Sequence, residues 1–259
     1  MTTPICKFYI DGKCKNGSSC KFLHNNIKKK YKKLVKVNTE TFEPWYDIPD
    51  MRVIIATPNI KLSESDIFLL PGLFDQNDDE IYYKLLDEID NSNVKNIDEL
   101  WKSWHGGTHL IADDHLNWKK SCPTFNMIIN KIAEYFNMDV KATRLNLYED
   151  LRDYKSMHFD AAAIDSKKAE IQNVTIGVSF GCTRDIQFQH AENRARISFP
   201  ISNGMIYGFG KQVNIDWRHG IPPIKGQDLA NEITDLEKSV LNTGRISIIL
   251  WGWIDQNKL

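Results

Sequence analysis

The sequence predicts an α+β protein: a barrel or sandwich of short strands with helices on one outer face, preceded by a small metal-binding module. Three observations support this prediction. Apolar residues recur at helical spacing before residue 139, and they alternate with a period of two afterwards. Three cysteines and a histidine cluster within the first 24 residues. The 259 residues, 42% of them hydrophobic, suffice for one sizeable core and a small appendage.

The metal-binding module has the spacing Cys-x7-Cys-x5-Cys-x3-His, with Cys6, Cys14, Cys20 and His24 as the ligands. Four such ligands suit a closed tetrahedral Zn²⁺ site. So short a segment cannot bury a core of its own, so the metal must supply its folding energy. The pattern resembles the CCCH zinc-finger family over residues 4–25. We therefore expect a Zn(II)-binding finger in residues 1–25.

Members of the CCCH family commonly bind single-stranded RNA by stacking bases on exposed aromatic rings. Here the resemblance implies that Phe8, Tyr9 and Phe22 are the stacking candidates, with neighbouring lysines on phosphates. The alternative is that these rings only cover the zinc site and that the finger contacts protein. The two other cysteines, Cys122 and Cys182, are expected to be inert buried thiols.

Charge is divided unevenly along the chain. Residues 1–36 hold ten lysines and one acidic residue, a formal charge of +9, which leaves −10 for the remainder because the total is −1. Any contact with a polyanion should therefore involve the N-terminal arm. We expect a basic linker at residues 26–45, acting either as a phosphate-contact or nuclear-localisation patch or as a solvated tether.

The body, residues 46–259, should begin with two amphipathic helices. Residues 78–90 carry apolar side chains at helical spacing behind three acidic residues, which favour a helix N-terminus. Residues 123–136 begin with Pro123, which suits the first helical position, and continue with an apolar stripe.

Strands should follow, in a core spanning about residues 140–255. The expected strands are 140–148, 172–180, 184–190, 195–200, 204–209, 212–218 and 244–251. Glycines at the joints favour a barrel or sandwich of short strands.

Candidate metal ligands lie in this strand region. His158 and Asp160 are two residues apart, which on a strand points both side chains to one face, and His219 lies at the end of a later strand. Two imidazoles and one carboxylate can occupy one face of an octahedral Fe(II) and leave positions open. Arg245 and Ser247 on the last strand can bind a dicarboxylate, because a guanidinium pairs bidentately with a carboxylate.

This ordered set resembles the Fe(II)/2-oxoglutarate dioxygenases, and Asn146-Leu147-Tyr148 resembles their AlkB-like branch. The resemblance, over residues 68–255, implies a double-stranded β-helix (jelly-roll) barrel. It implies that His158, Asp160 and His219 bind Fe(II). It also implies that 2-oxoglutarate is bound by Arg245, Ser247, Asn146 and Tyr148.

Two features depart from the AlkB-like pattern. The family typically carries a second Arg six residues after the first, and Trp251 stands there instead. We expect Trp251 to fill the core, with a place in the floor of the pocket as the alternative. The stretch 221–244 is also long for the family.

Residues 101–118 are rich in side chains that can stack on a base or bond to it: Trp101, Trp104, His105, His109, Asp113, Asp114, His115 and Trp118. In the AlkB-like branch a segment before the barrel covers the target nucleotide, which must leave its stack to react. For any single residue here, a place in a core aromatic cluster is the favoured interpretation.

We therefore predict an Fe(II)/2-oxoglutarate-dependent dioxygenase that hydroxylates or demethylates a nucleic acid, RNA favoured over DNA, brought in by the zinc finger. The alternatives are a non-catalytic RNA-binding protein on a degenerate dioxygenase scaffold, and a hydroxylase that acts on protein. No apolar run of about 18 residues and no secretory signal is found, so we expect an intracellular protein, cytoplasmic or nuclear, without membrane contact. The oligomeric state cannot be predicted.

Overall fold

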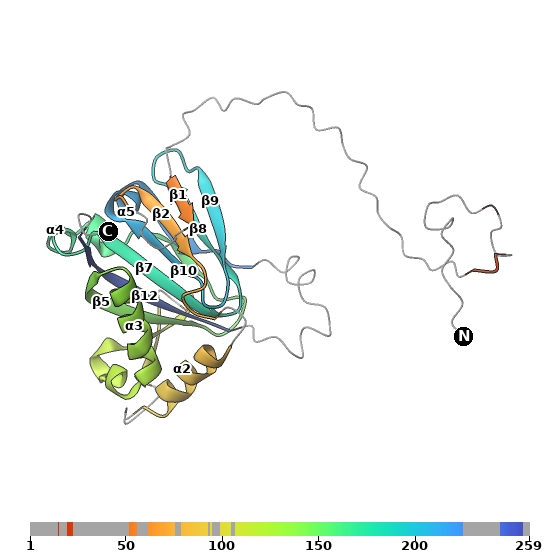
Figure 1. Ribbon diagram of the computed structural model, residues 1–259, viewed down its shortest axis with the longest axis horizontal. Helices are drawn as coiled ribbons and strands as arrows, with labels where there is room; N and C mark the ends of the chain where they lie inside the picture. Colours follow the sequence, from red (N-terminus) through yellow and green to blue (C-terminus); the bar gives the residue numbers. More distant parts are fainter. Residues whose placement is uncertain are drawn as a thin grey trace. The chain divides into compact units, whose positions relative to one another are not determined.

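A computed structural model of the protein describes residues 15, 20–22, 52–55, 62–75, 79–92, 94, 99–104, 107–224 and 244–255. The chain divides into two compact units, Met1–Asp47 and Ile48–Leu259. Every helix and strand below belongs to the second unit (Figure 1). Of the predicted zinc ligands, Cys6, Cys14 and His24 lie outside the described residues, as does the predicted linker 26–45. The domain boundaries at 25 and 45 stay predictions.

Two sheets form the second unit. The larger sheet has the strand order β1 (Arg52–Ile55), β2 (Asp66–Leu70), β10 (Ile206–Gly210), β7 (Val174–Gly181), β12 (Arg245–Ile254), β5 (Met138–Tyr148), β4 (Leu110–Ala112) and β3 (Trp101–Ser103). The smaller sheet has the order β6 (Lys155–His158), β11 (Trp217–Ile221), β8 (Arg184–His190) and β9 (Arg196–Ile201). Phe188 and Trp217 of the smaller sheet share one apolar cluster with Phe209 and Ile249 of the larger, so the sheets face each other. The predicted jelly-roll core is confirmed.

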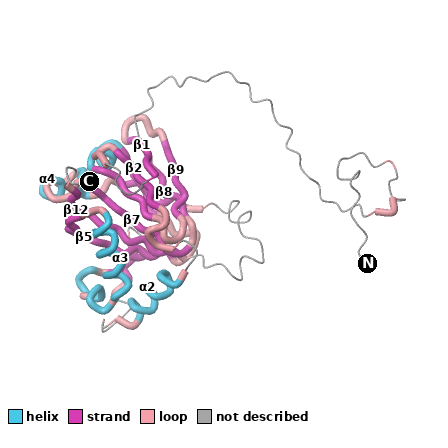
Figure 2. The backbone as a smooth tube through the Cα atoms, in the orientation of Figure 1, coloured by secondary structure: helices cyan, strands magenta, loops and turns pink. Residues whose placement is uncertain are grey.

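Two helices cover the outer face of the larger sheet (Figure 2). They are α2 (Glu80–Asp90) and α3 (Pro123–Tyr135), within two residues of the bounds that the sequence predicts. Leu85 and Ile89 of α2 and Ile128 and Ile132 of α3 are fully buried in one cluster with alternate side chains of β7 and β12. The apolar faces of α2 and α3 therefore pack on one face of the larger sheet, and the smaller sheet packs on the opposite face.

The predicted strand at 212–218 is wrong. Residues Lys211–Asp216 form the short helix α5, and the strand β11 begins only at Trp217. The chain passes here from β10 in the larger sheet to β11 in the smaller one, and a helical turn makes that crossing. The backbone N–H groups of Gln212 and Val213 donate to the carbonyl of Glu64, 2.9 and 3.3 Å away, which fixes the start of the turn.

Strands also occur before residue 140, where none was expected. β1 to β4 are three to five residues long and extend both edges of the larger sheet. Such short segments carry too few residues to show a period of two, and their pairing partners decide their conformation. The remaining short elements are the 3-10 helices η3 (Asp114–Leu116), η4 (Trp118–Ser121) and η5 (Ala161–Ala163) and the helix α4 (Ser166–Ala169).

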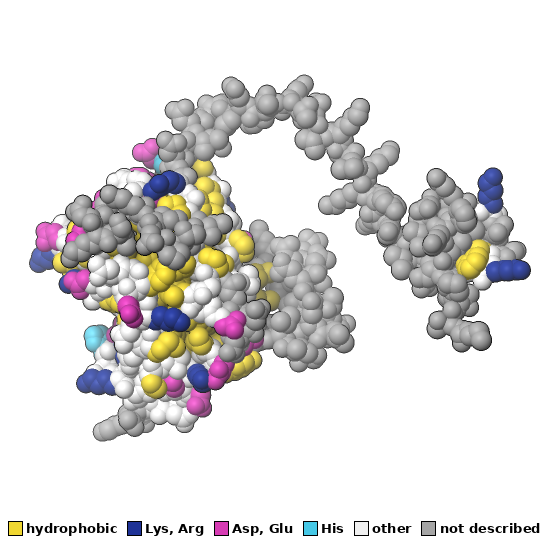
Figure 3. Space-filling view, in the orientation of Figure 1, with side chains coloured by type: hydrophobic (Ala, Val, Ile, Leu, Met, Phe, Trp, Pro, Cys, Tyr) yellow, Lys and Arg dark blue, Asp and Glu magenta, His cyan; other side chains and the backbone are white. Residues whose placement is uncertain are grey.

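Acidic and basic side chains are interspersed on the face of this unit shown in Figure 3. None of the helices described is long and apolar enough to cross a membrane.

A buried carboxylate fixes the start of β2. Asp66 is 1% exposed; it accepts hydrogen bonds from Arg52 Nε on β1 at 2.6 Å and from the Ser63 backbone N–H at 2.7 Å. Burial opposes ionisation of Asp66, but these hydrogen bonds outweigh it and hold the pKa of the carboxyl below its usual value. The folded state therefore favours the charged form.

Asp66→Asn should lower the free energy of unfolding by about 1.5–3 kcal/mol at neutral pH, because hydrogen bonds to a charged acceptor are lost. The folded pKa lies below the unfolded one, so this contribution is complete above the unfolded pKa of about 4 and is lost as the pH falls through the folded pKa. Denaturant unfolding from pH 7 to pH 3 should show wild type and variant converging. The exposed Asp185→Asn is the control; a difference for Asp66→Asn that stays constant with pH would contradict the account.

Candidate active site

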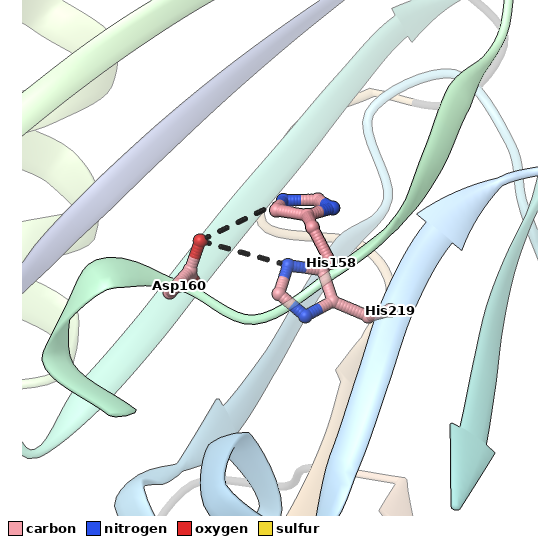
Figure 4. A group of neighbouring side chains, drawn as sticks. All are labelled: His158, Asp160 and His219. Atoms are coloured by element: carbon pink, nitrogen blue, oxygen red, sulfur yellow. Dashed lines mark ion pairs between the residues drawn. The ribbon is translucent and has the colours of Figure 1, made fainter. Parts of the chain in front are cut away.

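Three potential metal ligands converge beside the smaller sheet (Figure 4). The antiparallel ladder of β6 and β11 pairs His158 directly with His219, and their ring centroids are 4.4 Å apart. Asp160 Oδ1 lies 3.9 Å from His158 Nε2 and 3.7 Å from His219 Nε2. One ligand atom from each residue lies within 4.8 Å of the others. A single ion can therefore be held by all three.

The positions of these ligands along the strands differ in detail from the sequence prediction. β6 ends at His158, so Asp160 lies beyond the strand and begins η5. Its backbone stays extended, with φ −70° and ψ 153°, and this preserves the alternation that turns its side chain toward His158. His219 stands in the middle of β11, not at a strand end.

The three groups have the protonation states that a metal needs. Burial lowers the pKa of His219 to about 3 and also lowers the pKa of His158, so both rings are neutral at pH 7. Burial opposes ionisation of Asp160, but the two imidazoles, the Trp251 indole and Lys155 hold its pKa below the usual value. Two neutral imidazoles beside an ionised carboxylate suit a divalent cation.

Neighbouring residues orient the ligands. Thr175 Oγ1 on β7 donates to Asp160 Oδ2 at 2.8 Å, while Oδ1 faces the two imidazoles. The Asn214 side chain of α5 accepts from the Asp160 backbone N–H at 2.9 Å and donates to its carbonyl at 3.3 Å. His158 Nδ1 lies 2.9 Å from the Ser156 carbonyl, which can only accept, so Nδ1 carries the proton and Nε2 is left for a metal.

The inner face of the larger sheet carries the residues predicted to bind 2-oxoglutarate. Arg245 pairs with Tyr148, and Ser247 pairs with Asn146, across the β12–β5 ladder. Directly paired residues share a face, and alternate residues of one strand do so too, so all four point to the same side. Asn146, Tyr148 and Ser247 line a pocket of about 360 Å³ that also contains Asp160 and His219.

Arg245 is fully buried beside Tyr148, which lines this pocket. Its Nε donates to Ser179 Oγ at 2.7 Å, and its guanidinium carbon lies 4.9 Å from the centre of the Tyr148 ring. Among the described residues, nothing accepts a hydrogen bond from its two terminal nitrogens. A buried cation without an acceptor is costly, and two parallel N–H groups fit one carboxylate.

A larger pocket of about 1100 Å³, open to solvent, adjoins the same centre and is lined by both His158 and Asp160. Aromatic side chains line it, among them Trp104, Phe159 and Trp251. The Arg144 guanidinium lies 4.8 Å from the Trp104 ring centre and 5.7 Å from that of Trp251. The His158 side chain is 29% exposed and that of His219 only 9%, so the centre opens toward this pocket on the His158 side.

A family model described as the 2OG-Fe(II) oxygenase superfamily matches residues 88–250, more than half of the chain. The chain belongs to this superfamily. A second model, the CCCH-type zinc finger, matches residues 4–25. The prediction of an Fe(II)/2-oxoglutarate-dependent oxygenase is confirmed at the level of the superfamily, and the predicted N-terminal CCCH finger matches its family model. With it, Fe(II), 2-oxoglutarate and zinc are confirmed as the cofactors that these families use.

Similar proteins resemble this chain over only part of their length. The DNA oxidative demethylase ALKBH2 of Bos taurus is 20% identical over 153 residues, which cover 56% of this chain and 53% of the relative. The chain thus spans about half the length of that curated relative. The solved structure of OsALKBH1 is 18% identical, with a TM-score of 0.33 over 44% of this chain and 49% of the other.

The residues of this oxygenase fit the family's cofactors. The neutral His158 and His219 and the ionised Asp160 form the two-histidine, one-carboxylate set that suits Fe(II). The two terminal nitrogens of Arg245 are donors without an acceptor among the described residues, and a carboxylate of 2-oxoglutarate could accept their hydrogen bonds.

Trp251 lies at the edge of the core. It is partly buried and packs against the apolar cluster between the sheets, and it also lines both the smaller and the larger pocket. The structure therefore supports both the expected core contact and the alternative, a place in the pocket. The oxygenase has an indole where the AlkB-like pattern has a second arginine.

The residues of the 101–118 segment lie in different surroundings. Trp104 lines the larger pocket. His109 is buried and stacks on Tyr148, with ring centroids 5.0 Å apart, and burial lowers its pKa to about 4. Trp118 lies in the core against Phe125. The core interpretation holds for Trp118, and His105 lies outside the described residues.

Several residues of the site could not be predicted from the sequence. Thr175, Ser179 and Asn214 hold Asp160 and Arg245, and Lys155 lines both pockets. Only the strand pattern could have indicated Thr175 and Ser179, which point to the same face of β7. Asn214 lies in the segment predicted as a strand, so no signal pointed to it.

Thr175→Val should raise the dissociation constant for Mn(II) by about 10–100-fold, the usual cost of losing a partner that orients a metal ligand. The change keeps the shape of the buried side chain and removes the hydroxyl that holds Asp160 Oδ2. Calorimetric titration with Mn(II) measures the effect. Thr124→Val is a matched control, because that buried hydroxyl donates to Glu88 in the helical layer. Equal affinity for Mn(II) in wild type and Thr175→Val would contradict the role.

Proposed function

We propose that this protein is an Fe(II)/2-oxoglutarate-dependent dioxygenase that oxidises N-alkyl groups of a nucleic acid, with single-stranded RNA preferred, and that the zinc finger recruits the substrate. One arrangement carries the catalytic part. Two of the three Fe(II) ligands, Asp160 and His219, line one pocket with Tyr148 and Ser247. Arg245 pairs with Tyr148 across the β12–β5 ladder, and its buried guanidinium has two nitrogens without an acceptor among the described residues.

His158, Asp160 and His219 would bind Fe(II), and Arg245 would bind a carboxylate of 2-oxoglutarate. When bound, Fe(II) and 2-oxoglutarate supply the oxidation of a substrate C–H bond by O₂, with release of succinate and CO₂. Thr175 and Asn214 hold Asp160 in place. The two facing sheets would enclose the cosubstrate, and an ion pair with Arg245 would be strong in such a buried place.

The larger pocket supports a nucleobase as the substrate group. Trp104, Phe159 and Trp251 offer aromatic faces, and Arg144 offers a planar cation between two of them. Single-stranded bases bind to such surfaces by stacking, worth about 1–3 kcal/mol per base. The relative from Bos taurus is named a DNA oxidative demethylase. The CCCH finger supports RNA over DNA, and the lysine-rich arm supports a nucleic acid of either kind. With such a substrate we propose a cytoplasmic or nuclear location.

The test is turnover by the full chain with Fe(II) and 2-oxoglutarate, measured as succinate and formaldehyde. The substrates are N-methylated single-stranded RNA, the same sequence as single-stranded and duplex DNA, and methylated histone-type peptides. Hydroxylation of an N-methyl group releases formaldehyde, so we expect equal amounts of succinate and formaldehyde, with single-stranded RNA fastest. Substrate-dependent succinate with peptides alone would replace this proposal by a protein hydroxylase. If no substrate yields succinate, the remaining alternative is a non-catalytic RNA-binding protein on a degenerate dioxygenase scaffold.

The basic arm should make RNA binding steeply dependent on salt. Counterion release lowers log Kobs by about 0.7 per phosphate neutralised for each unit of log salt. Replacing Lys28, Lys29, Lys30, Lys32 and Lys33 together with Gln should weaken binding and make this slope smaller. A salt titration of single-stranded RNA binding compares the two proteins. Equal slopes would exclude the arm from the RNA contact, and would favour the solvated tether.

A further inference from the structure

A bulge in β6 turns Lys155 toward the active site. The β6–β11 ladder pairs His158 with His219 and then Lys155 with Ile221. The two paired residues are three positions apart on β6 but only two apart on β11, so β6 contains one extra residue. Residues three apart on a regular strand point to opposite faces. The extra residue re-aims the side chain, as bulges beside active sites commonly do. Lys155 and His158 therefore both contribute to the wall of the larger pocket.

Gly220 makes room for this bulge. A Cβ at residue 220 would lie 2.5 Å from the Lys155 carbonyl oxygen and 3.0 Å from that of Ser156. These are backbone atoms, which cannot turn aside as a flexible side chain can. The glycine next to His219 thus permits the close approach of the strand that carries Lys155.

Lys155 brings a positive charge into the smaller pocket. It is the only Lys or Arg among the described residues that line this pocket, where Asn146, Asp160 and Ser247 also lie. Among the described residues, none accepts a hydrogen bond from its ammonium group or forms an ion pair with it. Burial lowers the pKa of Lys155 to about 8. Asp160 on the wall of the same pocket attracts this ammonium and raises its pKa, and burial outweighs that attraction.

The cosubstrate supplies a suitable anion. 2-Oxoglutarate carries two carboxylates, and Arg245 accounts for one of them. Where the AlkB-like pattern has a second arginine, this chain has Trp251, which cannot bind a carboxylate as an ion pair. Trp251 and Lys155 line the same pocket, so the lost cation has a replacement on the opposite sheet.

We propose that Lys155 binds the second carboxylate of 2-oxoglutarate, the one next to the oxo group, and replaces the missing arginine. The inference rests on the proposed function, because it requires 2-oxoglutarate in the smaller pocket. Lys155 also lines the larger pocket, and a substrate phosphate is the competing partner there. Lys155 shares the smaller pocket with Ser247, which is expected to bind the cosubstrate, and this favours the cosubstrate as its partner.

The test is calorimetric titration of the full-length, zinc-loaded protein with 2-oxoglutarate in the presence of Mn(II), which supports binding without turnover. Lys155→Met keeps the length of the side chain and removes its charge, and it should raise the dissociation constant by tenfold or more. Lys155→Arg should recover most of the affinity. Lys168→Met is the control, because Lys168 lines the larger pocket alone and the change should leave 2-oxoglutarate affinity within twofold.

The thermal midpoint of the protein without 2-oxoglutarate separates binding from a structural role. Removing a partly buried ammonium whose pKa burial lowers should leave the midpoint of Lys155→Met unchanged or higher, while the increase that 2-oxoglutarate adds becomes smaller. Wild type that does not bind 2-oxoglutarate at all would overturn the proposed function. Wild type and Lys155→Met with equal affinity would overturn only the role of Lys155. Loss of oligonucleotide binding with unchanged 2-oxoglutarate affinity would also overturn that role, and would assign Lys155 to the substrate.

Discussion

Asp160→Ala should abolish succinate formation while the barrel stays folded. Asp160 supplies the only carboxylate of the three-ligand set, and Oδ1 lies less than 4 Å from both imidazoles. Loss of a partner that merely orients a ligand costs about 10–100-fold in metal affinity or activity, so loss of the ligand itself should cost more. The removed side chain leaves the Thr175 hydroxyl without its acceptor, at about 1–3 kcal/mol, a fraction of the stability of a domain.

Three measurements on Asp160→Ala are needed together: succinate formation, Mn(II) affinity and the thermal midpoint. We expect the first two to collapse and the third to change little. Asp185→Ala, on the exposed side of β8, is the control and should keep all three. Normal turnover in Asp160→Ala would exclude the assigned ligand set. If Asp160→Ala does not fold, the same three measurements are made on His158→Ala, because the His158 side chain is more exposed than that of Asp160.

Arg245→Met should raise the dissociation constant for 2-oxoglutarate by about 30-fold or more, because removing one partner of a buried, hydrogen-bonded charge pair costs about 2 kcal/mol or more. Arg245→Lys should recover part of this, since a point charge replaces a bidentate fork. The protein without 2-oxoglutarate should respond in the opposite direction. Its buried guanidinium has two nitrogens without an acceptor among the described residues, so Arg245→Met should leave the free energy of unfolding unchanged or higher.

Titration with 2-oxoglutarate in Mn(II) and unfolding without it measure these two effects. Binding loss with unimpaired stability identifies Arg245 as a ligand-binding residue. A large loss of stability without 2-oxoglutarate, with affinity retained, would instead make it a structural cation held by Ser179 and Tyr148.

The predictable part of the site follows from strand alternation. Arg245 and Ser247 share a face because they are two residues apart, and so do Asn146 and Tyr148. The sequence could not show that the ladder would pair these two sets directly. Helix α3 was predictable because its apolar stripe is continuous and Pro123 fixes its first turn.

The unpredicted part depends on register and on crossings between sheets. Residues 212–218 alternate between polar and apolar, which predicts a strand, yet the chain must cross sheets there and forms α5. Asn214 reaches Asp160 only because of that helix. Lys155 points inward only because of the bulge, and a one-residue slip of register is invisible in the sequence of one strand.

We expect one ion to bind to His158, Asp160 and His219, and 2-oxoglutarate to bind beside it on Arg245. The decisive experiment is a crystal structure of the full chain grown without oxygen, with Fe(II) and 2-oxoglutarate. Anomalous diffraction at the iron edge should place one iron between these three side chains, with a carboxylate of 2-oxoglutarate on the two terminal nitrogens of Arg245. Iron bound elsewhere, or 2-oxoglutarate without contact to Arg245, would contradict this expectation.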